Sequence, residues 1–209
     1  MKALIIADGS PPPGELVRKH SDSDIIIAAD GGLHIIQKLG LKPDFLIGDF
    51  DSADIREIGT INQNDTRIIQ YAVEKNETDG MIALNIAFEQ GAFDIVMLGA
   101  LGKRTDHALA NIMLLKYARD HGAQMIIEDE YCEVSLVAGE TVIRGYLGQT
   151  VSILPFAGSA TVSSDNSLHY HMERLFMGEG DPVGISNILE REEARITIDQ
   201  GMALLFKIK

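Results

Sequence analysis

Residues 25–32 read Ile25-Ile26-Ile27-Ala28-Ala29-Asp30-Gly31-Gly32, a short apolar run closed by an aspartate and two glycines. An unbroken run of β-branched and small apolar residues is typical of a strand buried on both faces of a parallel sheet. The same pattern recurs at residues 3–7, 45–47, 95–98 and 125–127, and residues 67–70 are a weaker example. The first part of the chain therefore predicts a parallel sheet.

Helical patterns alternate with these runs. Apolar residues recur at spacings of three and four over residues 81–88, after Thr78, a suitable N-cap. A second amphipathic pattern covers residues 108–118 and ends near His121-Gly122. Because strand–helix–strand units are right-handed, the alternation predicts an α/β fold with a doubly wound, mostly parallel sheet.

The pattern changes after about residue 129. Short, often alternating apolar segments are separated by turns that carry glycine, at residues 134–137, 140–144, 150–154, 160–162, 194–198 and 203–206. Strands at such spacing without intervening helices predict an all-β sandwich or barrel. We therefore expect two domains, residues 1–129 (α/β) and residues 130–209 (all-β).

Composition limits the classes of partner and compartment. The 209 residues include 18 Lys and Arg against 31 Asp and Glu, a net charge of −13. This excess argues against nucleic acid or an anionic membrane as the main partner, because both require a basic face. Cys132 is the single cysteine, so no internal disulfide can form. The apolar run at residues 3–7 is too short for a signal peptide or a membrane span, and a cytoplasmic protein is expected.

Gly48-Asp49-Phe50-Asp51-Ser52 is the most informative segment for function. It follows a predicted strand, and open α/β sheets bind ligands outside the carboxyl ends of their strands. Asp49 and Asp51 project to the same side of an extended chain and repel each other unless a cation intervenes. A hard cation, Mg²⁺ before Ca²⁺, is the natural occupant. The plainer alternative is a loop rich in turn-forming aspartates.

Three further acidic loops follow the predicted strands or open helices. Asp30-Gly31-Gly32 permits close approach of a ligand to the backbone, and Asp79 opens a predicted helix. Residues 99–107 combine glycines, Lys103 and Arg104 before another helix, which suits a phosphate. Each loop also has an ordinary structural explanation. Together they predict a site for a polyphosphate and Mg²⁺, although neither a Walker P-loop nor a dinucleotide-binding glycine motif is present.

Five segments resemble, in order and spacing, the thiamine pyrophosphokinase family over nearly the whole chain: Asp30-Gly31-Gly32, Lys42-Pro43-Asp44 leading into Gly48-Asp49-Phe50-Asp51-Ser52, Lys75-Asn76-Glu77-Thr78-Asp79, the loop 99–107, and Ser186-Asn187. The resemblance implies transfer of a pyrophosphoryl group from ATP to thiamine, with thiamine diphosphate and AMP as products. It also implies a homodimer whose active sites lie between the α/β domain of one subunit and the β domain of the other.

The resemblance also implies roles for individual residues. It places Asp49, Asp51, Asp79 and Asp106 in the catalytic set and the first three on Mg²⁺. It assigns the nucleotide and its phosphates to Asp30, Gly31, Gly32, Lys75, Gly102, Lys103, Arg104 and His107. Ser186 and Asn187 of the other chain would contact thiamine. Three positions depart from the family's usual pattern: Lys103 replaces a glycine, Leu101 a small polar residue, and Asn76 an aspartate.

Two other functions remain open from the residues. A metal-dependent phosphatase would use Asp49 or Asp51 as a nucleophile, but such a motif belongs after the first strand, and here it follows the third. A non-catalytic thiamine or nucleotide sensor would be consistent with the altered glycine loop. The transfer itself is expected to be direct, without a phosphoenzyme, because positioning and charge neutralisation dominate phosphoryl transfer.

Overall fold

The computed structural model describes residues 1–48, 65–71, 76–102 and 104–209. The chain divides into two compact units, Met1–Glu130 and Tyr131–Lys209. In the described ranges, no helix has both the length and the apolar character that crossing a bilayer requires.

The first unit is built on a parallel sheet. Its described strands are β1 (Lys2–Ile6), β2 (Ile25–Ala29), β3 (Phe45–Gly48), β4 (Arg67–Gln70), β5 (Asp94–Leu98) and β6 (Gln124–Glu128). Their order across the sheet is β6-β5-β1-β2-β3-β4, and every neighbouring pair is parallel. The predicted parallel sheet is confirmed.

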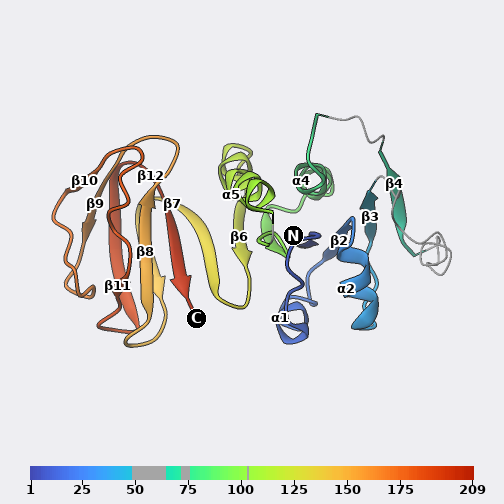
Figure 1. Ribbon diagram of the computed structural model, residues 1–209, viewed down its shortest axis with the longest axis horizontal. Coiled ribbons are helices and arrows are strands. Elements are labelled where there is room, and N and C mark those ends of the chain that lie inside the picture. The colour runs from blue at the N-terminus through green and yellow to red at the C-terminus, as the bar shows by residue number, and fades with distance from the viewer. Residues whose placement is uncertain (49–64, 72–75, 103) are drawn as a thin grey trace. The chain divides into compact units, whose positions relative to one another are not determined.

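Helices cover both faces of this sheet (Figure 1). The helices α1 (Gly14–Lys19) and α2 (Gly32–Lys38) lie on one face, and α4 (Asp79–Glu89) and α5 (Thr105–Asp120) lie on the other. Alternate strand residues face opposite sides, and one side packs under α1 and α2 in a core that includes Leu4, Ile6, Leu16, Val17, Ile26, Leu33, Ile36 and Leu98. This arrangement is the doubly wound fold that the sequence predicts.

The strand order reverses direction next to β1. From β1 the chain moves outward through β2, β3 and β4, and then returns to place β5 on the opposite side of β1. The loops that leave β1 and β5 therefore lead to helices on opposite faces of the sheet, α1 and α5. A crevice opens at such a point, and it is where open α/β sheets bind ligands.

The second unit is antiparallel. Residues 131–209, all of them described, form β7 (Cys132–Arg144), β8 (Thr150–Pro155), β9 (Ala160–Ser164), β10 (Leu175–Met177), β11 (Asn187–Ile188) and β12 (Glu193–Ile208). The long strand β12 pairs with β7 along its length, with β9 through its first half and with β8 through its second half. Strands β8, β9 and β12 share one buried core, which includes Val151, Ile153, Val162, Ile196 and Leu205.

Two predicted breaks in this unit are wrong. Residues 134–137 and 140–144 belong to the single strand β7, and residues 194–198 and 203–206 belong to β12. Gly139 and Gly201 adopt left-handed φ values of +66° and +81° inside these strands. The register with β7 shifts between Ile198 and Ala203, so the glycines mark irregularities in continuous strands and not turns between strands.

Candidate active site

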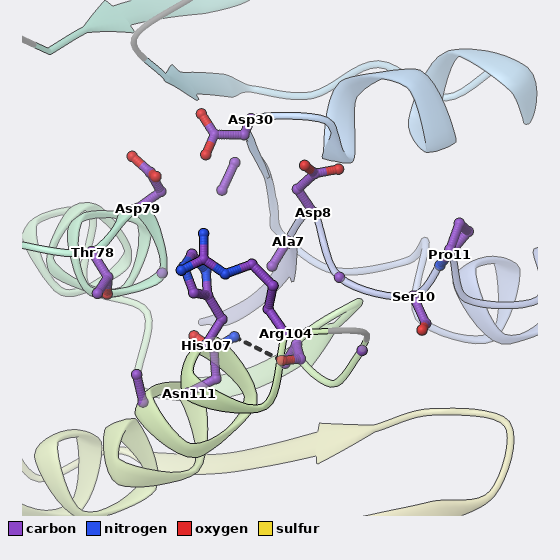
Figure 2. Close-up of a pocket in the computed structure, with 16 residues that line it drawn as sticks. Ala7, Asp8, Ser10, Pro11, Asp30, Thr78, Asp79, Arg104, His107 and Asn111 are labelled. Carbon is purple, nitrogen blue, oxygen red and sulfur yellow. Dashed lines mark hydrogen bonds between the residues drawn. The ribbon is translucent and has the colours of Figure 1, made fainter. Parts of the chain in front are cut away.

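A cavity of about 560 Å³ lies at the carboxyl ends of β1, β2 and β5, where the strand order reverses (Figure 2). All of its walls belong to the first unit. The described residues that line it are Ala7, Asp8, Gly9, Ser10, Pro11, Ala29, Asp30, Thr78, Asp79, Gly80, Ala100, Gly102, Arg104, His107, Ala110 and Asn111.

The loops that follow β1 and β5 are joined through their backbones. The amide of Gly9 donates to the carbonyl of Gly99 at 2.7 Å, and the amide of Ser10 donates to the carbonyl of Leu101 at 2.8 Å. A Cβ atom at Gly9 would lie 2.3 Å from the Gly99 oxygen, so only glycine permits this approach. The floor of the cavity is therefore rigid backbone.

The N-terminus of α4 forms another wall. Thr78 caps this helix, as predicted, because its hydroxyl accepts a hydrogen bond from the Met81 amide at 3.2 Å. Asp79 is the first helical residue and lines the cavity. The helix continues through Gly80, whose lack of a side chain makes room for Asn111 of α5, and Asn111 donates to the Ala100 carbonyl at 2.7 Å.

Arg104 supplies the positive charge of the described cavity wall. Its Nη2 donates to Asp106 Oδ2 at 2.7 Å and its Nε donates to Oδ1 at 3.3 Å. The hydrogen bond from Arg104 lowers the pKa of Asp106 to about 2. Both side chains are exposed, at 69% and 66%, so the guanidinium remains accessible to an anionic ligand. Figure 2 shows it extending into the cavity beside His107.

Three carboxylates, those of Asp8, Asp30 and Asp79, border the cavity (Figure 2). Asp30 has a left-handed φ of 49°, a conformation that non-glycine residues adopt mainly under constraint at functional sites. Partial burial raises the pKa of Asp8 above its ordinary value. Facing carboxylates repel one another, so this wall suits a cation or hydrogen-bond donors better than a bare anion.

The structure brings together five of the predicted site residues as cavity lining: Asp30, Asp79, Gly102, Arg104 and His107. Gly31 and Gly32 open α2, and Asp106 contacts Arg104 without lining the cavity. Asp49, Asp51, Lys75 and Lys103 lie outside the described residues. Within the described ranges no three metal-ligating side chains gather, so the magnesium site stays a prediction.

Sequence reasoning did not include Asp8 or Ser10 in the site. Asp8-Gly9 ends the first apolar run just as Asp30-Gly31 ends the second, so the signal was present. Ser10 lacks such a signal, because its place in the cavity depends on the backbone bond to Leu101.

Ser186 and Asn187 lie in the second unit. Asn187 is only 1% exposed, and its amide accepts from the Tyr170 and Ile188 amides, both at 2.9 Å, and donates to the Tyr170 carbonyl at 2.8 Å. The side-chain amide of Asn187 thus holds the backbone of Tyr170, a residue that is 61% exposed. Ser186 is exposed, with a left-handed φ of 59°, and its amide donates to the Ser152 hydroxyl at 3.1 Å. Tyr170 is a candidate that sequence reasoning missed.

Comparison with known proteins identifies both units. A family model described as "Thiamin pyrophosphokinase, catalytic domain" matches residues 17–127, and one described as "Thiamin pyrophosphokinase, vitamin B1 binding domain" matches residues 140–203. A thiamine pyrophosphokinase of Bacillus subtilis is 25% identical over 99% of both chains. Thiamin pyrophosphokinase 1 of Caenorhabditis elegans is 24% identical over 88% of this chain and 78% of its own.

Solved structures share the fold. The crystal structure of thiamine pyrophosphokinase from Bacillus subtilis superposes with a TM-score of 0.89 at 22% identity, covering 100% of this chain and 99% of the other. Yeast thiamin pyrophosphokinase gives a TM-score of 0.82 at 16% identity, covering 100% and 86%. At these identities the structural likeness concerns the fold alone, and it confirms the predicted fold class.

Proposed function

The chain belongs to the thiamin pyrophosphokinase family, and we propose from this premise that it transfers the pyrophosphoryl group of ATP to the hydroxyethyl oxygen of thiamine. The products are thiamine diphosphate and AMP. The observation that carries the proposal is the cavity at the strand-order reversal, where Arg104 and His107 are accessible beside the acidic residues Asp30 and Asp79.

The nucleotide and its phosphates bind along this cavity in our proposal. Arg104 neutralises phosphate oxygens, and a guanidinium suits this role because it donates several hydrogen bonds in fixed geometry. Its partner Asp106 keeps it oriented when no phosphate is bound. His107 and Gly102 line the same wall. Gly31, Gly32, Lys75 and Lys103 complete the proposed nucleotide-binding set.

The chemistry of the cavity fits a magnesium ion. A nucleoside triphosphate that enters a cavity lined by Asp8, Asp30 and Asp79 would be repelled unless a cation screens the negative charges. Hard oxygen donors are the ligands that Mg²⁺ prefers, and we assign it to Asp49, Asp51 and Asp79. When bound, the ion would neutralise charge on the phosphate oxygens.

The transfer is direct in this proposal. The hydroxyl oxygen of thiamine attacks the β-phosphorus, the bond between this phosphorus and the oxygen bridging to the α-phosphate breaks, and AMP leaves with the electron pair. The hydroxyl proton passes to water. Arg104 stabilises the charge that develops on the phosphate oxygens, and the rigid loops after β1 and β5 hold the nucleotide in line. No strong base is required for a loose transition state.

The second unit supplies the thiamine contacts in a homodimer. Ser186 is exposed and contacts thiamine directly, while Asn187 acts by fixing Tyr170, whose exposed ring offers a flat surface to an aromatic ligand. The site is shared, with the α/β domain (residues 1–129) of one subunit and the β domain (residues 130–209) of the other. A single cysteine and dependence on ATP are consistent with a cytoplasmic location.

Turnover with purified protein, ATP, Mg²⁺ and thiamine tests the proposal. We expect AMP and thiamine diphosphate to form, and chelation of the metal to stop their formation. Asp79→Asn should lower kcat/KM at least about 100-fold, because the variant loses a metal ligand. Asp120→Asn, at the far end of α5, should stay within about twofold of wild type. No product from the wild type would reject the function, and full activity of Asp79→Asn would reject the metal assignment.

A further inference from the structure

Asp8 is the cavity residue to which the proposed reaction has not yet assigned a role. It lies two residues after the end of β1 and lines the cavity, with its carboxylate beside the turn that begins α2 (Figure 2). Its carboxylate also contacts the first turn that follows β2, because a Cβ atom at Gly31 would lie 2.0 Å from Asp8 Oδ1. The backbone of this turn therefore fixes where the carboxylate of Asp8 lies.

The Asp8 side chain is exposed to the cavity, and its carboxylate is only partly desolvated. Burial alone raises the pKa of Asp8, and no hydrogen bond or positive charge from the described residues lowers it. Its neighbours on the same loop, Ala7, Ser10 and Pro11, are uncharged, and Asp30 lies on the same side of the cavity. In the absence of a cation, a carboxylate repels phosphate and accepts hydrogen bonds, so the part of a ligand that faces Asp8 is one that carries hydroxyl or amino groups.

The position of Asp8 in the cavity indicates which part of a nucleotide would face its carboxylate. Arg104 and His107 approach from the α5 side of the cavity and take the phosphates, whereas Asp8 and Asp30 stand on the opposite side, at the ends of β1 and β2 (Figure 2). In doubly wound dinucleotide-binding folds, an acidic side chain after the second strand accepts a hydrogen bond from a ribose hydroxyl; Asp30 holds that position here, and Asp8 follows the adjacent strand β1. We propose that Asp8 accepts a hydrogen bond from the ribose diol of ATP and so selects ribonucleotides over deoxyribonucleotides. The inference rests on the proposed function, which supplies ATP as the nucleotide.

Titration calorimetry with AMP, 2′-deoxy-AMP and 3′-deoxy-AMP tests this role without thiamine and without turnover. The wild type should bind AMP about tenfold more tightly than at least one deoxy analogue, the effect of one hydrogen bond to a charged group. In Asp8→Ala this preference should fall to within about twofold, while binding of inorganic pyrophosphate should not weaken. Asp22→Ala, which removes an 83% exposed aspartate outside the cavity, should behave as wild type. Circular dichroism and thermal melting establish that both variants fold.

Two results would overturn the role. One is a wild type that binds AMP and both deoxy analogues equally or binds none of them. The other is an Asp8→Ala variant that keeps the preference for AMP over the deoxy analogues. If that variant also loses kcat, Asp8 would instead be assigned to proton transfer from the nucleophile. The proposed transfer is judged separately, because a protein can discriminate AMP from deoxy-AMP and still form no thiamine diphosphate.

Discussion

At the scale of single residues, the Arg104 side chain forms an ion pair with Asp106 and still remains accessible to a ligand. Its guanidinium is 69% exposed while bonded to Asp106, and it extends into the cavity. An exposed pair of this kind contributes little to stability because solvent screens it. In our proposal the guanidinium of Arg104 serves ligand binding, so its replacement should affect activity much more than folding.

Arg104→Ala should reduce kcat/KM for ATP by about 100-fold, because the charge that develops on the phosphate oxygens loses its guanidinium. Arg104→Lys should recover part of this loss, since a lysine restores the charge without the paired hydrogen bonds. Arg119→Ala, at the exposed last turn of α5, serves as the control and should leave kcat/KM unchanged. Steady-state kinetics at varied ATP measures all three, and equal losses for Arg104→Ala and Arg119→Ala would contradict the role.

Asp8→Asn should change the pH dependence of stability. Burial raises the pKa of Asp8 from 3.8, so the folded state binds this proton more readily than the unfolded state. The resulting stability is present below the ordinary pKa and is lost as the pH rises through the raised value. At pH 7, Asp8→Asn should therefore melt slightly above wild type, by a shift that solvent screening of this exposed group keeps small, and the difference should shrink toward pH 4.

Asp106→Asn is the matched variant for this measurement, and its expected effect on the melting temperature has the opposite sign. The pKa of Asp106 is lowered to about 2 by Arg104, so its ionised form favours the folded state at every pH above the ordinary aspartate value. Asp106→Asn should not raise the melting temperature at pH 7. A melting temperature of Asp8→Asn below that of wild type at pH 7 would show that its carboxylate is compensated.

At the scale of elements, a buried polar cluster joins α1 to β6. Glu128, the last residue of β6, is 1% exposed and bonds to His20 Nε2 at 2.7 Å and to Lys19 Nζ at 2.8 Å. His20 is also buried and caps the C-terminus of α1. A six-residue helix is too short to be stable alone, so this cluster holds it on the sheet.

His20→Ala should destabilise the protein by about 2–4 kcal/mol, because it leaves a buried carboxylate with one partner fewer. Lys19→Ala removes the other partner, but Lys19 is 55% exposed, so the expected loss is below about 1 kcal/mol. Urea unfolding of the two variants measures the difference. A smaller loss for His20→Ala than for Lys19→Ala would contradict the assigned role of the cluster.

Thr78→Ala should remove the N-cap of α4. The amide of Met81 would lose its hydrogen bond to the Thr78 hydroxyl, at a cost of about 1 kcal/mol. Thr78→Ser keeps an equivalent oxygen and should retain most of the stability. Thermal unfolding compares the two, and identical melting temperatures for Thr78→Ala and Thr78→Ser would show that the cap contributes nothing.

The sequence predicts the elements that have strong local signals. The run at residues 25–29 coincides with β2, and Thr78 caps α4, because both depend on neighbouring residues. The short strands β10 and β11 and the short helices α1 and α2 were missed, since tertiary contacts rather than local pattern define them. Gly139 and Gly201 misled the prediction because a glycine in a strand resembles a turn when its partner strand is unknown.

The site was predictable where an acidic or basic residue follows a strand. Asp30, Asp79 and Arg104 could be placed at one edge of the sheet because parallel strands end at the same edge. Asn187 shows the limit of this reasoning, since its amide bonds to Tyr170 at a distance of 17 residues and is buried. Local sequence does not reveal that a side chain such as that of Asn187 is buried and positions Tyr170, and so does not itself contact a ligand at the surface.

At the scale of the whole molecule, the proposed homodimer makes a prediction about mixing. Asp79→Asn damages the catalytic unit, and Ser186→Trp blocks the proposed thiamine surface on the other unit. If each active site combines units from two chains, a mixed dimer contains one intact site and one doubly altered site. Mixing the two inactive variants should then restore up to about a quarter of the wild-type activity. A mixture that forms mixed dimers and stays inactive would place each site within one chain.

The net charge of −13 is also a property of the whole molecule. An acidic protein that binds a triphosphate must screen its own charge, and the acidic edge of the cavity is where the proposed cation would do so.

The central claim, that two phosphates move together from ATP to thiamine, is tested most directly by ³¹P NMR of a single reaction mixture. We predict equal amounts of AMP and thiamine diphosphate. Formation of ADP with thiamine monophosphate, or of free phosphate alone, would contradict it.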